Sequence, residues 1–323
     1  NRDLTNILGV KSLLCDLFTT GHGLYCTGHS PVKYINQFYL FVYMKISVSM
    51  LSGYEYCPRK LYLQYVLCIT EPPKESLVLG SLRHEIYDFI NKNEEGIVTS
   101  ITKKLQLSNI LNIYRALYLK ILREKIIKNK SKLSSVNLEL ASVFKRTYPL
   151  ILNEAEARAT NIFNFIQEYN IYGKELWENL TPKIISELRV ESNILQLKGI
   201  IDKVEIHKDG YVPVELKTGK MPKEGIWPGH RIQIAAYALL LEEKYNKKIK
   251  EGFIHYLDAK ELRHVAINPF MKEEITALTK EVQELLNRQY PPNYCQNKNK
   301  CTNCGLREDC YNEAQIDTLL SEI

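Results

Sequence analysis

The chain has 323 residues, of which 45% are hydrophobic and 25% are charged, the ordinary composition of a globular protein that can bury a sizeable core. No apolar run approaches the roughly 20 residues that cross a bilayer, and no secretion signal is present, so we exclude a membrane protein and expect a cytoplasmic one. A net charge of +6 favours polyanionic partners only weakly, because many proteins without a nucleic-acid partner share it.

Two stretches of the chain, 120–132 and 244–250, concentrate the basic residues. These residues are Lys120, Arg123, Lys125, Lys128, Lys130, Lys132, Lys244, Lys247, Lys248 and Lys250. A solvated helix face explains such runs more readily than a nucleic-acid contact does, so charge alone assigns them no role.

The first segment in chain order, residues 1–43, differs from the rest because no helical or strand period persists in it. Gly21, Gly23 and Gly28 also interrupt this segment. We assign this N-terminal extension no function. The chain begins without methionine and Met44 opens a more orderly stretch, so we expect the working protein to start near Met44.

Residues 44–98 are predicted to form N-terminal helices. One helical stretch runs from Ile46 to about Tyr65 and contains YEYCPRKLYLQY, and a second runs from about Val78 to Asn91. Residues 99–185 are predicted to form a helical insertion, because long amphipathic runs such as ILNIYRALYLKILREKIIKNK and EAEARATNIFNFIQEY dominate them.

Residues 186–270 mix strands and helices. ELRVES, ILQLKGIIDKVEI and YVPVELK are short, β-branched and separated by turn residues, which indicates strands. A helix is predicted in HRIQIAAYALLLEEKY, and GFIHYL and LRHVAIN indicate a further strand pair joined by Asp258–Glu261. Residues 271–323 supply a final helix, near 271–288, and a cysteine-rich tail. These elements predict an α/β fold with a helical insertion before its core.

The segment GIIDKVEIHKDGYVPVELK carries the residues with the most distinctive chemistry. Asp209 and Gly210 between two apolar runs predict a two-residue hairpin loop. With that loop, Asp202 lies opposite Lys217 and diagonally from Glu215, on one face of the hairpin and within roughly 4.5–8 Å. A bulge would shift this register.

Two carboxylates at this spacing suit a hard cation such as Mg²⁺ or Mn²⁺, which prefers oxygen ligands and polarises a phosphoryl oxygen. Lys217 can orient the attacking water or stabilise charge that builds on the phosphate. A surface salt bridge between Lys217 and Asp202 or Glu215 explains the same pattern equally well when the hairpin is considered alone.

Polar residues on two neighbouring helices favour a functional site. Gln233 and Tyr237 are four residues apart and share one face of an otherwise apolar helix. A polar pair on such a helix is unusual unless it has a function. His84 lies on a helix with an apolar face, and a lone histidine of this sort is more often structural than a ligand.

Eight cysteines occur in the chain. They are Cys15, Cys26, Cys57, Cys68, Cys295, Cys301, Cys304 and Cys310. An even number would suggest disulfides in a small secreted chain, whereas this chain is long and places three cysteines in a C-x2-C-x5-C loop, so metal binding is the better interpretation. A fourth ligand must come from elsewhere, and four thiolates can hold an iron–sulfur cluster or a structural zinc ion.

In chain order, four segments resemble the motifs of the RecB-like nucleases in the PD-(D/E)XK superfamily. They are Gly80–Glu85, Gly199–Asp202, Glu215–Lys217 and Gln233–Tyr237. Tyr56–Arg59 and the tail with Cys301, Cys304 and Cys310 look like the CRISPR-associated Cas-four exonucleases. The resemblance spans about Ile46 to Tyr311 and is specific in the joint order of its motifs, although the insertion at 99–185 is longer than in compact members.

This resemblance implies a restriction-endonuclease-like core at 186–270, a mixed β-sheet flanked by helices. It implies that His84, Asp202, Glu215 and the carbonyl of Leu216 bind the catalytic Mn²⁺ or Mg²⁺.

The resemblance also implies how the remaining site residues act. Lys217 would be the catalytic lysine beside the two catalytic carboxylates of Asp202 and Glu215. Gln233 and Tyr237 would position the DNA backbone or this lysine.

For the cysteines, the resemblance favours a [4Fe–4S] cluster over zinc, with Cys57, Cys301, Cys304 and Cys310 as its ligands. Cys57 lies far upstream in the family's YxYCPR context, and Cys295 is the second choice for its place. Closing so long a loop costs entropy that grows only logarithmically with its length, and metal binding can supply on the order of 10 kcal/mol. We therefore expect an iron–sulfur clasp that joins the N-terminal and C-terminal parts.

The function that the resemblance implies is a metal-dependent exonuclease acting 5′ to 3′ on single-stranded DNA ends. It would trim fragments for CRISPR spacer acquisition, with the CRISPR integrase complex as its partner. A RecB-like repair or replication nuclease is the alternative among enzymes; no G-x4-GK[ST] loop occurs here, so a helicase partner would be a separate chain. A non-catalytic iron–sulfur DNA-binding scaffold is the alternative from another class, and homo-oligomerisation stays open.

Overall fold

The computed structural model describes residues 45–322. The expectations for residues 1–43 and for a start near Met44 lie outside this range. Contacts within the chain define two compact units, which we call the sheet unit and the cysteine unit. The sheet unit runs to Tyr56 and resumes over Pro72–Glu284, and the cysteine unit combines Cys57–Glu71 with the residues from Leu285 onward.

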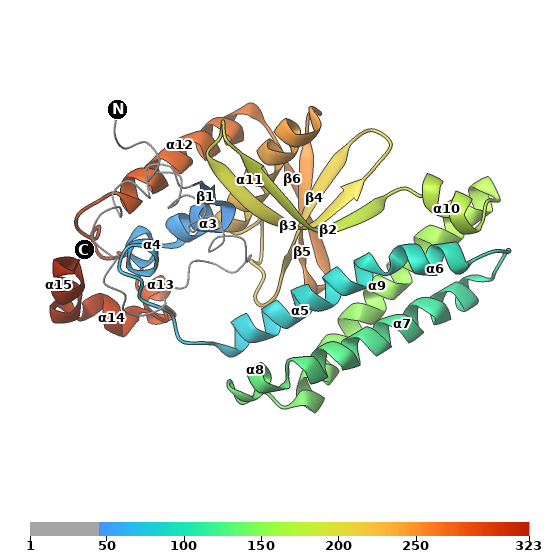
Figure 1. Ribbon diagram of the computed structural model, residues 1–323, viewed down its shortest axis with the longest axis horizontal. Helices are drawn as coiled ribbons and strands as arrows, with labels where there is room; N and C mark the ends of the chain where they lie inside the picture. The colour runs from blue at the N-terminus through green and yellow to red at the C-terminus, as the bar shows by residue number, and fades with distance from the viewer. Residues whose placement is uncertain (1–44, 323) are drawn as a thin grey trace, which may run out of the picture. The chain divides into compact units, whose positions relative to one another are not determined.

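Six strands form one mixed sheet in the sheet unit, which confirms the mixed sheet that the resemblance implies (Figure 1). They are β1 (Ile46–Ser47), β2 (Lys183–Ser192), β3 (Leu197–Ile206), β4 (Tyr211–Lys217), β5 (Glu251–Tyr256) and β6 (Glu261–Ala266). The order is β1-β3-β4-β5-β6, and β2 also pairs with β3. β1 is parallel to β3 and β4 is parallel to β5, whereas the β2–β3, β3–β4 and β5–β6 pairs are antiparallel.

Strand β4 lies at the centre of this sheet and carries part of the predicted site. Four consecutive residues, Pro213–Leu216, are buried, as expected for a strand that is covered on both faces. The parallel pairing of β4 with β5 needs a crossover, which helix α11 (Pro228–Tyr245) provides. A Cβ atom added at Gly229 would lie 2.6 Å from Oγ of Ser52 in helix α3 (Val48–Tyr56), so glycine allows α3 and α11 to approach closely.

The predicted helical stretch from Ile46 to Tyr65 is not continuous. Helix α3 ends at Tyr56 and helix α4 (Pro58–Tyr65) begins two residues later. Cys57 between them is extended, with φ −167° and ψ 110°. A proline disfavours helical backbone in the residue before it and is well suited to the first position of a helix, so Pro58 ends one helix and starts the next.

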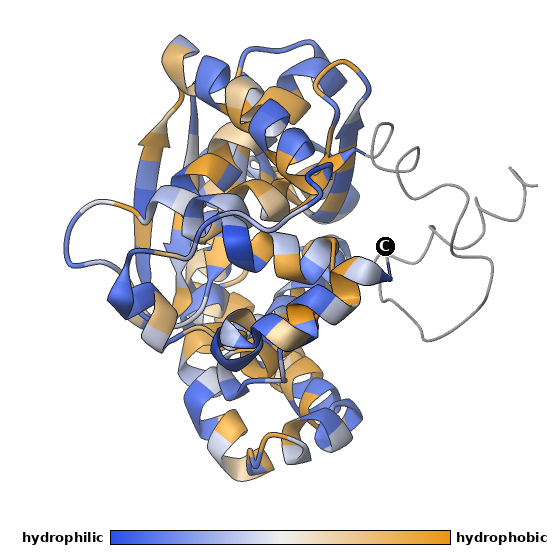
Figure 2. Ribbon diagram, turned by 90° about the vertical axis from the view of Figure 1, so that its left-hand side faces the viewer, coloured by the Kyte–Doolittle hydropathy of each residue, from blue (hydrophilic) through white to orange (hydrophobic). Residues whose placement is uncertain are grey.

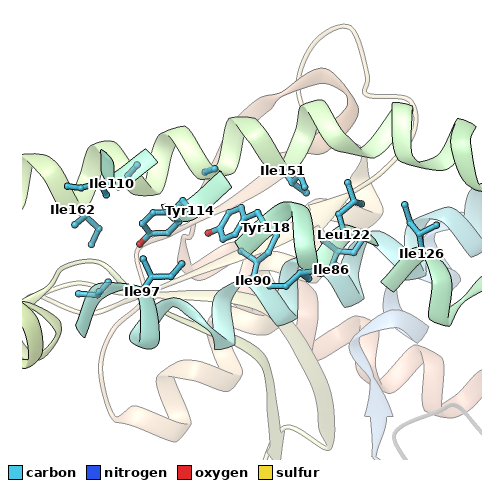
Figure 3. Close-up of a cluster of buried hydrophobic side chains, with 14 of the residues drawn as sticks. Ile86, Ile90, Ile97, Ile110, Tyr114, Tyr118, Leu122, Ile126, Ile151 and Ile162 are labelled. Carbon is cyan, nitrogen blue, oxygen red and sulfur yellow. The ribbon is translucent and has the colours of Figure 1, made fainter. Parts of the chain in front are cut away.

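Five helices lie within residues 94–179, the region of the helical insertion predicted at 99–185, and we call them the insertion. They are α6 (Glu94–Ser100), α7 (Leu107–Lys128), α8 (Lys130–Ser134), α9 (Leu140–Tyr169) and α10 (Gly173–Asn179). Together with α5 (Glu75–Lys92) they enclose a hydrophobic cluster in which α5, α7 and α9 contribute interleaved side chains (Figure 3). Tyr114 and Tyr118 meet edge to face there, with ring centroids 5.5 Å apart. The buried ion pair of Glu94 and Arg158 joins α6 to α9, so the insertion is a packed part of the sheet unit.

A 3₁₀ turn, η1 (Leu257–Ala259), connects β5 to β6, and helix α12 (Pro269–Leu286) follows. Hydrophilic and hydrophobic bands alternate along the helices, the pattern of helices that bury one face (Figure 2). Within residues 45–322, no helix is both long and apolar enough to span a bilayer.

The cysteine unit consists of α4 and three short C-terminal helices. The latter are α13 (Lys298–Thr302), α14 (Arg307–Tyr311) and α15 (Glu313–Ser321). The hydroxyl of Tyr62 donates to the carbonyl of Arg288 at 3.2 Å, and Glu71 accepts the backbone N–H of Gly305 at 3.1 Å. These contacts hold the segment around Cys57 against the C-terminal tail.

Candidate active site and cysteine cluster

The loop of the β3–β4 hairpin differs from the predicted one. His207 and Gly210 exchange backbone hydrogen bonds of 2.9 and 3.4 Å, so the loop consists of Lys208 and Asp209. The prediction of an Asp209-Gly210 loop is therefore wrong. That loop needs a positive φ at both residues, and neither residue lies in this region.

The corrected register still brings the predicted side chains together. Lys203 pairs with Val214, so the next position places Asp202 opposite Glu215 and not opposite Lys217. The shift amounts to two residues, and side chains on a strand alternate between faces with a period of two. The two carboxylates and the lysine therefore remain on one face.

Asp202 is fixed by contacts to two elements of the sheet unit. Its Oδ1 lies 2.9 Å from Nδ1 of His84 on α5, and its Oδ2 accepts the backbone N–H of Leu216 at 2.8 Å. The sequence favours a structural role for a lone histidine, whereas here His84 meets a site carboxylate. The carbonyl of Leu216 stays a predicted ligand.

Glu215 presents an oxygen that needs a partner. Its side chain is 6% exposed, and Oε1 accepts hydrogen bonds from Nζ of Lys217 at 2.8 Å and from Nε2 of Gln233 at 3.2 Å. Oε2 is buried and has no hydrogen-bond partner among the described residues. A buried carboxylate oxygen without a partner costs free energy, which a bound cation would offset. The imidazole and carboxylate donors of this site therefore fit a hard divalent ion.

The two carboxyl groups differ in their acidity. Burial raises the pKa of Glu215, and the neighbouring charge of Asp202 raises it further, to about 7. Burial opposes ionisation of Asp202 as well, but the contact with His84 outweighs it and lowers the pKa of this carboxyl. Without a cation, one carboxylate is therefore charged at neutral pH and the other is half protonated.

The other two predicted site residues lie on α11 and are buried. Gln233 points its amide nitrogen at Glu215, and its Oε1 has no partner among residues 45–322. Tyr237 is 4% exposed, and a Cβ atom added at Gly199 would lie 2.8 Å from its ring. The glycine of the Gly199–Asp202 segment thus makes room for the tyrosine. Contact of either side chain with DNA stays a prediction.

Glu187 belongs to this cluster but was not found from the sequence. It lies on β2 between Ser186, which pairs with Lys203, and Leu188. Glu187, His84 and Asp202 each offer one possible ligand atom, and these three atoms lie within 4.8 Å of one another. Its φ of 49° is unusual for a residue within a strand. The alternating pattern of ELRVES places it on a strand, but only the register against β3 reveals that it faces Asp202.

His230 at the start of α11 is a second residue that the sequence did not single out. Burial and the charge of Lys217 lower its pKa to about 4. Its Nδ1 lies 3.0 Å from the hydroxyl of Tyr256. His230 is therefore neutral at neutral pH and adds no positive charge beside Lys217.

The basic stretch at 120–132 is largely a structural feature in this fold. Lys125 is buried, and both Lys125 and Lys128 donate to Oε1 of Glu85 at 3.0 Å. Lys120 forms a long ion pair of 3.9 Å with Glu124 on the same helix. Ion pairs within the protein thus account for Lys125 and Lys128, and the solvated helix face that the sequence favours for this run does not describe the buried Lys125.

The cysteine unit gathers the four predicted ligands, Cys57, Cys301, Cys304 and Cys310, as free thiols. Burial and the neighbouring Cys295 raise the pKa of Cys57. Burial, Cys295 and the charges of Cys304 and Cys310 likewise raise the pKa of Cys301. Neighbouring thiols thus oppose one another's ionisation. A bound metal would favour their ionised form, because metals bind thiolates.

Cys295 is a fifth thiol in the same neighbourhood. It interacts with the side chains of both Cys57 and Cys301, and its carbonyl accepts the Cys301 thiol at 3.5 Å. Cys57 itself caps helix α4 by accepting the backbone N–H of Lys60 at 3.4 Å. The unit thus holds five free thiols, one more than the four thiolates of the expected metal centre, which stays a prediction.

Comparison with known proteins places this geometry in a family. The model of the PD-(D/E)XK nuclease superfamily matches residues 45–311. A CRISPR-associated exonuclease Cas4/endonuclease Cas1 fusion of Leptospira interrogans is 30% identical over 150 residues, covering 44% of this chain and 28% of that protein. A CRISPR-associated exonuclease Cas4 of Methanocaldococcus jannaschii is 25% identical over 161 residues, covering 50% of this chain and 81% of that protein.

A DNA replication ATP-dependent helicase/nuclease JHS1 of Arabidopsis thaliana is 29% identical over 131 residues, covering 35% of this chain and 10% of that protein. The aligned segments are thus small parts of the fusion protein and of this helicase/nuclease. The family model, in contrast, spans most of the chain and every predicted site residue from Cys57 to Cys310. The chain therefore belongs to the PD-(D/E)XK nuclease superfamily.

Proposed function

We propose that this chain is a divalent-metal-dependent exonuclease that acts on the ends of single-stranded DNA. The observation that carries the proposal is the buried carboxylate of Glu215, which lies opposite Asp202 in the hairpin and whose Oε2 has no partner among the described residues. A nuclease of this superfamily needs a hard cation at such a place, and the available ligand atoms suit Mn²⁺ or Mg²⁺.

In this mechanism, His84, Asp202 and Glu215 would hold the ion, and the carbonyl of Leu216 would add an oxygen. When bound, the ion would supply Lewis-acid chemistry toward the scissile phosphate and the attacking water. Glu187 lies close enough to His84 and Asp202 to contribute a further carboxylate oxygen.

The chain's own side chains orient the reaction. The side chain of Lys217 is 20% exposed and its ammonium group lies 2.8 Å from Glu215, so it can donate to the attacking water or to a phosphate oxygen. Water adds to phosphorus, the bond to the leaving sugar oxygen breaks, and that oxygen takes up a proton. Gln233 keeps Glu215 in place through its amide, and Tyr237 packs behind the site.

We further propose that the enzyme trims DNA for CRISPR spacer acquisition, in the 5′ to 3′ direction and together with the integrase. Relatives in which a Cas4 exonuclease is fused to a Cas1 endonuclease, from Leptospira interrogans and Myxococcus xanthus, support this partner. A repair or replication nuclease is the second candidate, because the helicase/nuclease of Arabidopsis thaliana matches over 35% of this chain.

For the cysteine unit we propose a [4Fe–4S] cluster held by Cys57, Cys301, Cys304 and Cys310. The cluster would cross-link the start of α4 to the C-terminal tail and so stabilise the unit. Cys57 is preferred to Cys295 as the fourth ligand because of its YxYCPR context, although Cys295 interacts with Cys57 and Cys301.

Asp202→Asn and Glu215→Gln should each lower the rate of single-stranded DNA cleavage by roughly 100-fold or more, because each removes charge from the ion site. Glu191→Gln is the matched control, since this exposed carboxylate lies on β2 away from the cluster. Release of nucleotides from end-labelled DNA with Mn²⁺, Mg²⁺ or EDTA measures the effect.

Cleavage in EDTA, or full activity of both variants, would contradict the assignment. Tight DNA binding without any cleavage would favour the non-catalytic scaffold. Labels at the 5′ and 3′ ends distinguish the direction of digestion, because the label at the attacked end is released first.

The affinity for Mn²⁺ should rise with pH between about 6 and 8. The pKa of Glu215 is about 7 in the absence of a cation, so protons compete with Mn²⁺ below this pH and no longer do so above it. Isothermal titration of Mn²⁺ at several pH values measures the effect. Glu215→Gln should flatten the dependence, and an equally steep dependence in that variant would refute the explanation.

Cys57→Ser should lose iron and the visible absorbance of the cluster, whereas Cys295→Ser should retain both. Iron and sulfide analysis of protein purified without oxygen provides the measurement. The opposite pattern would assign the fourth ligand to Cys295, and zinc in place of iron would overturn the cluster assignment.

A further inference from the structure

Arg83 immediately precedes the metal-site histidine on α5, and its side chain is only 1% exposed. Its Nη1 lies 2.8 Å from both carboxylate oxygens of Asp258, which is in η1 after β5. Asp258 is the ion-pair partner of Arg83 within residues 45–322. A buried guanidinium that loses its counter-charge is costly, so this pair is fixed in place.

Asp258 also reaches the segment that follows Lys217. Its Oδ2 accepts the backbone N–H of Gly219 at 2.7 Å. Gly219 has a φ of 90°, a conformation that favours glycine. One carboxylate therefore connects α5, on which His84 lies, with the end of the strand that carries Glu215 and Lys217.

A second close contact lies at the same place. A Cβ atom added at Gly80, one turn before His84 on α5, would lie 3.0 Å from Oγ1 of Thr218. Helix α5 and the segment after β4 thus touch directly beside the ion pair. Glycine at position 80 permits this approach.

Strand β4 needs such support at its site end. Its ladder with β3 stops at the Lys203–Val214 pair, so Glu215–Lys217 pair only with β5 among the described strands. Strands β4 and β5 are parallel, and Lys217 is level with Tyr256. Gly219 and Asp258 therefore follow neighbouring strand ends, where a side-chain contact can set the position of both.

We propose that Arg83 and Asp258 are positioning residues that hold the Glu215–Lys217 end of β4 at the correct distance from His84. The pair contacts neither DNA nor the ion. It acts through the backbone of Gly219 and through α5. In this way it fixes the ligand atoms of β4 relative to the ligand atom of His84 on α5. This inference rests on the proposed ion site.

Asp258→Ala tests the proposal, with Asp258→Asn as a milder variant that keeps an oxygen for Gly219 but loses the charge. Unbound Mn²⁺ is counted by its aqueous EPR signal during titration of the whole chain. Asp258→Ala should raise the Kd for Mn²⁺ about tenfold or more, the size of effect usual for partners that orient metal ligands, and Asp258→Asn should raise it less. At saturating Mn²⁺, kcat should fall while the KM for DNA stays the same.

Glu85→Gln is the matched control. Glu85 follows His84 on α5, but its carboxylate accepts from Lys125, Lys128 and Asn129 of the insertion and does not reach β4. The variant should lower the thermal midpoint and leave the Kd for Mn²⁺ unchanged.

If Asp258→Ala and Asp258→Asn bind Mn²⁺ as tightly as the parent but have lower thermal midpoints, the ion pair has only a structural role. That result would overturn this inference and leave the proposed function intact. A parent protein that binds no Mn²⁺ would instead refute the proposed function on which the inference rests.

Discussion

The candidate site depends on the burial of one carboxylate in the central strand. Glu215 lies in a row of four buried residues on β4, across from a second carboxylate. Lys217 and Gln233 satisfy one of its oxygens, and the other has no partner among the described residues. Two neighbouring acidic groups oppose each other's ionisation, and a bound cation would relieve this repulsion.

Much of the surrounding fold serves to keep these groups in place. The crossover from β4 to β5 brings α11 over the sheet, and with it Gln233 and Tyr237. Helix α5 brings His84 to Asp202, and the ion pair of Arg83 with Asp258 joins this helix to the turn after β5. The lysines of the insertion contact Glu85 on the same helix.

The sequence predicted which side chains share a face of the hairpin better than it predicted their exact pairing. The hairpin register was off by two positions, because the Asp-Gly pair does not adopt the positive φ angles that the predicted loop requires. The prediction that Asp202 and Glu215 share a face survived, since a shift of two residues preserves the face of each side chain. Glu187 was missed because its nearness to Asp202 depends on the pairing of two strands, which local alternation does not reveal.

Long-range contacts account for the other differences. Spacing alone identified three clustered cysteines, but the interactions of Cys295 with Cys57 and with Cys301 follow from the packing of the cysteine unit. Lys125 appeared to belong to a solvated basic run, whereas the fold buries it against Glu85 on another helix. Helical periodicity does not distinguish a lysine that forms a buried ion pair from one that faces solvent.

Locating Mn²⁺ by its anomalous scattering in crystals soaked with the ion tests the central claim most directly. The account predicts one strong peak within about 2.2 Å of ligand atoms of His84, Asp202 and Glu215. Crystals in which Mn²⁺ occupies other places at saturating concentration, while the carboxylates of Asp202 and Glu215 bind none, would contradict it.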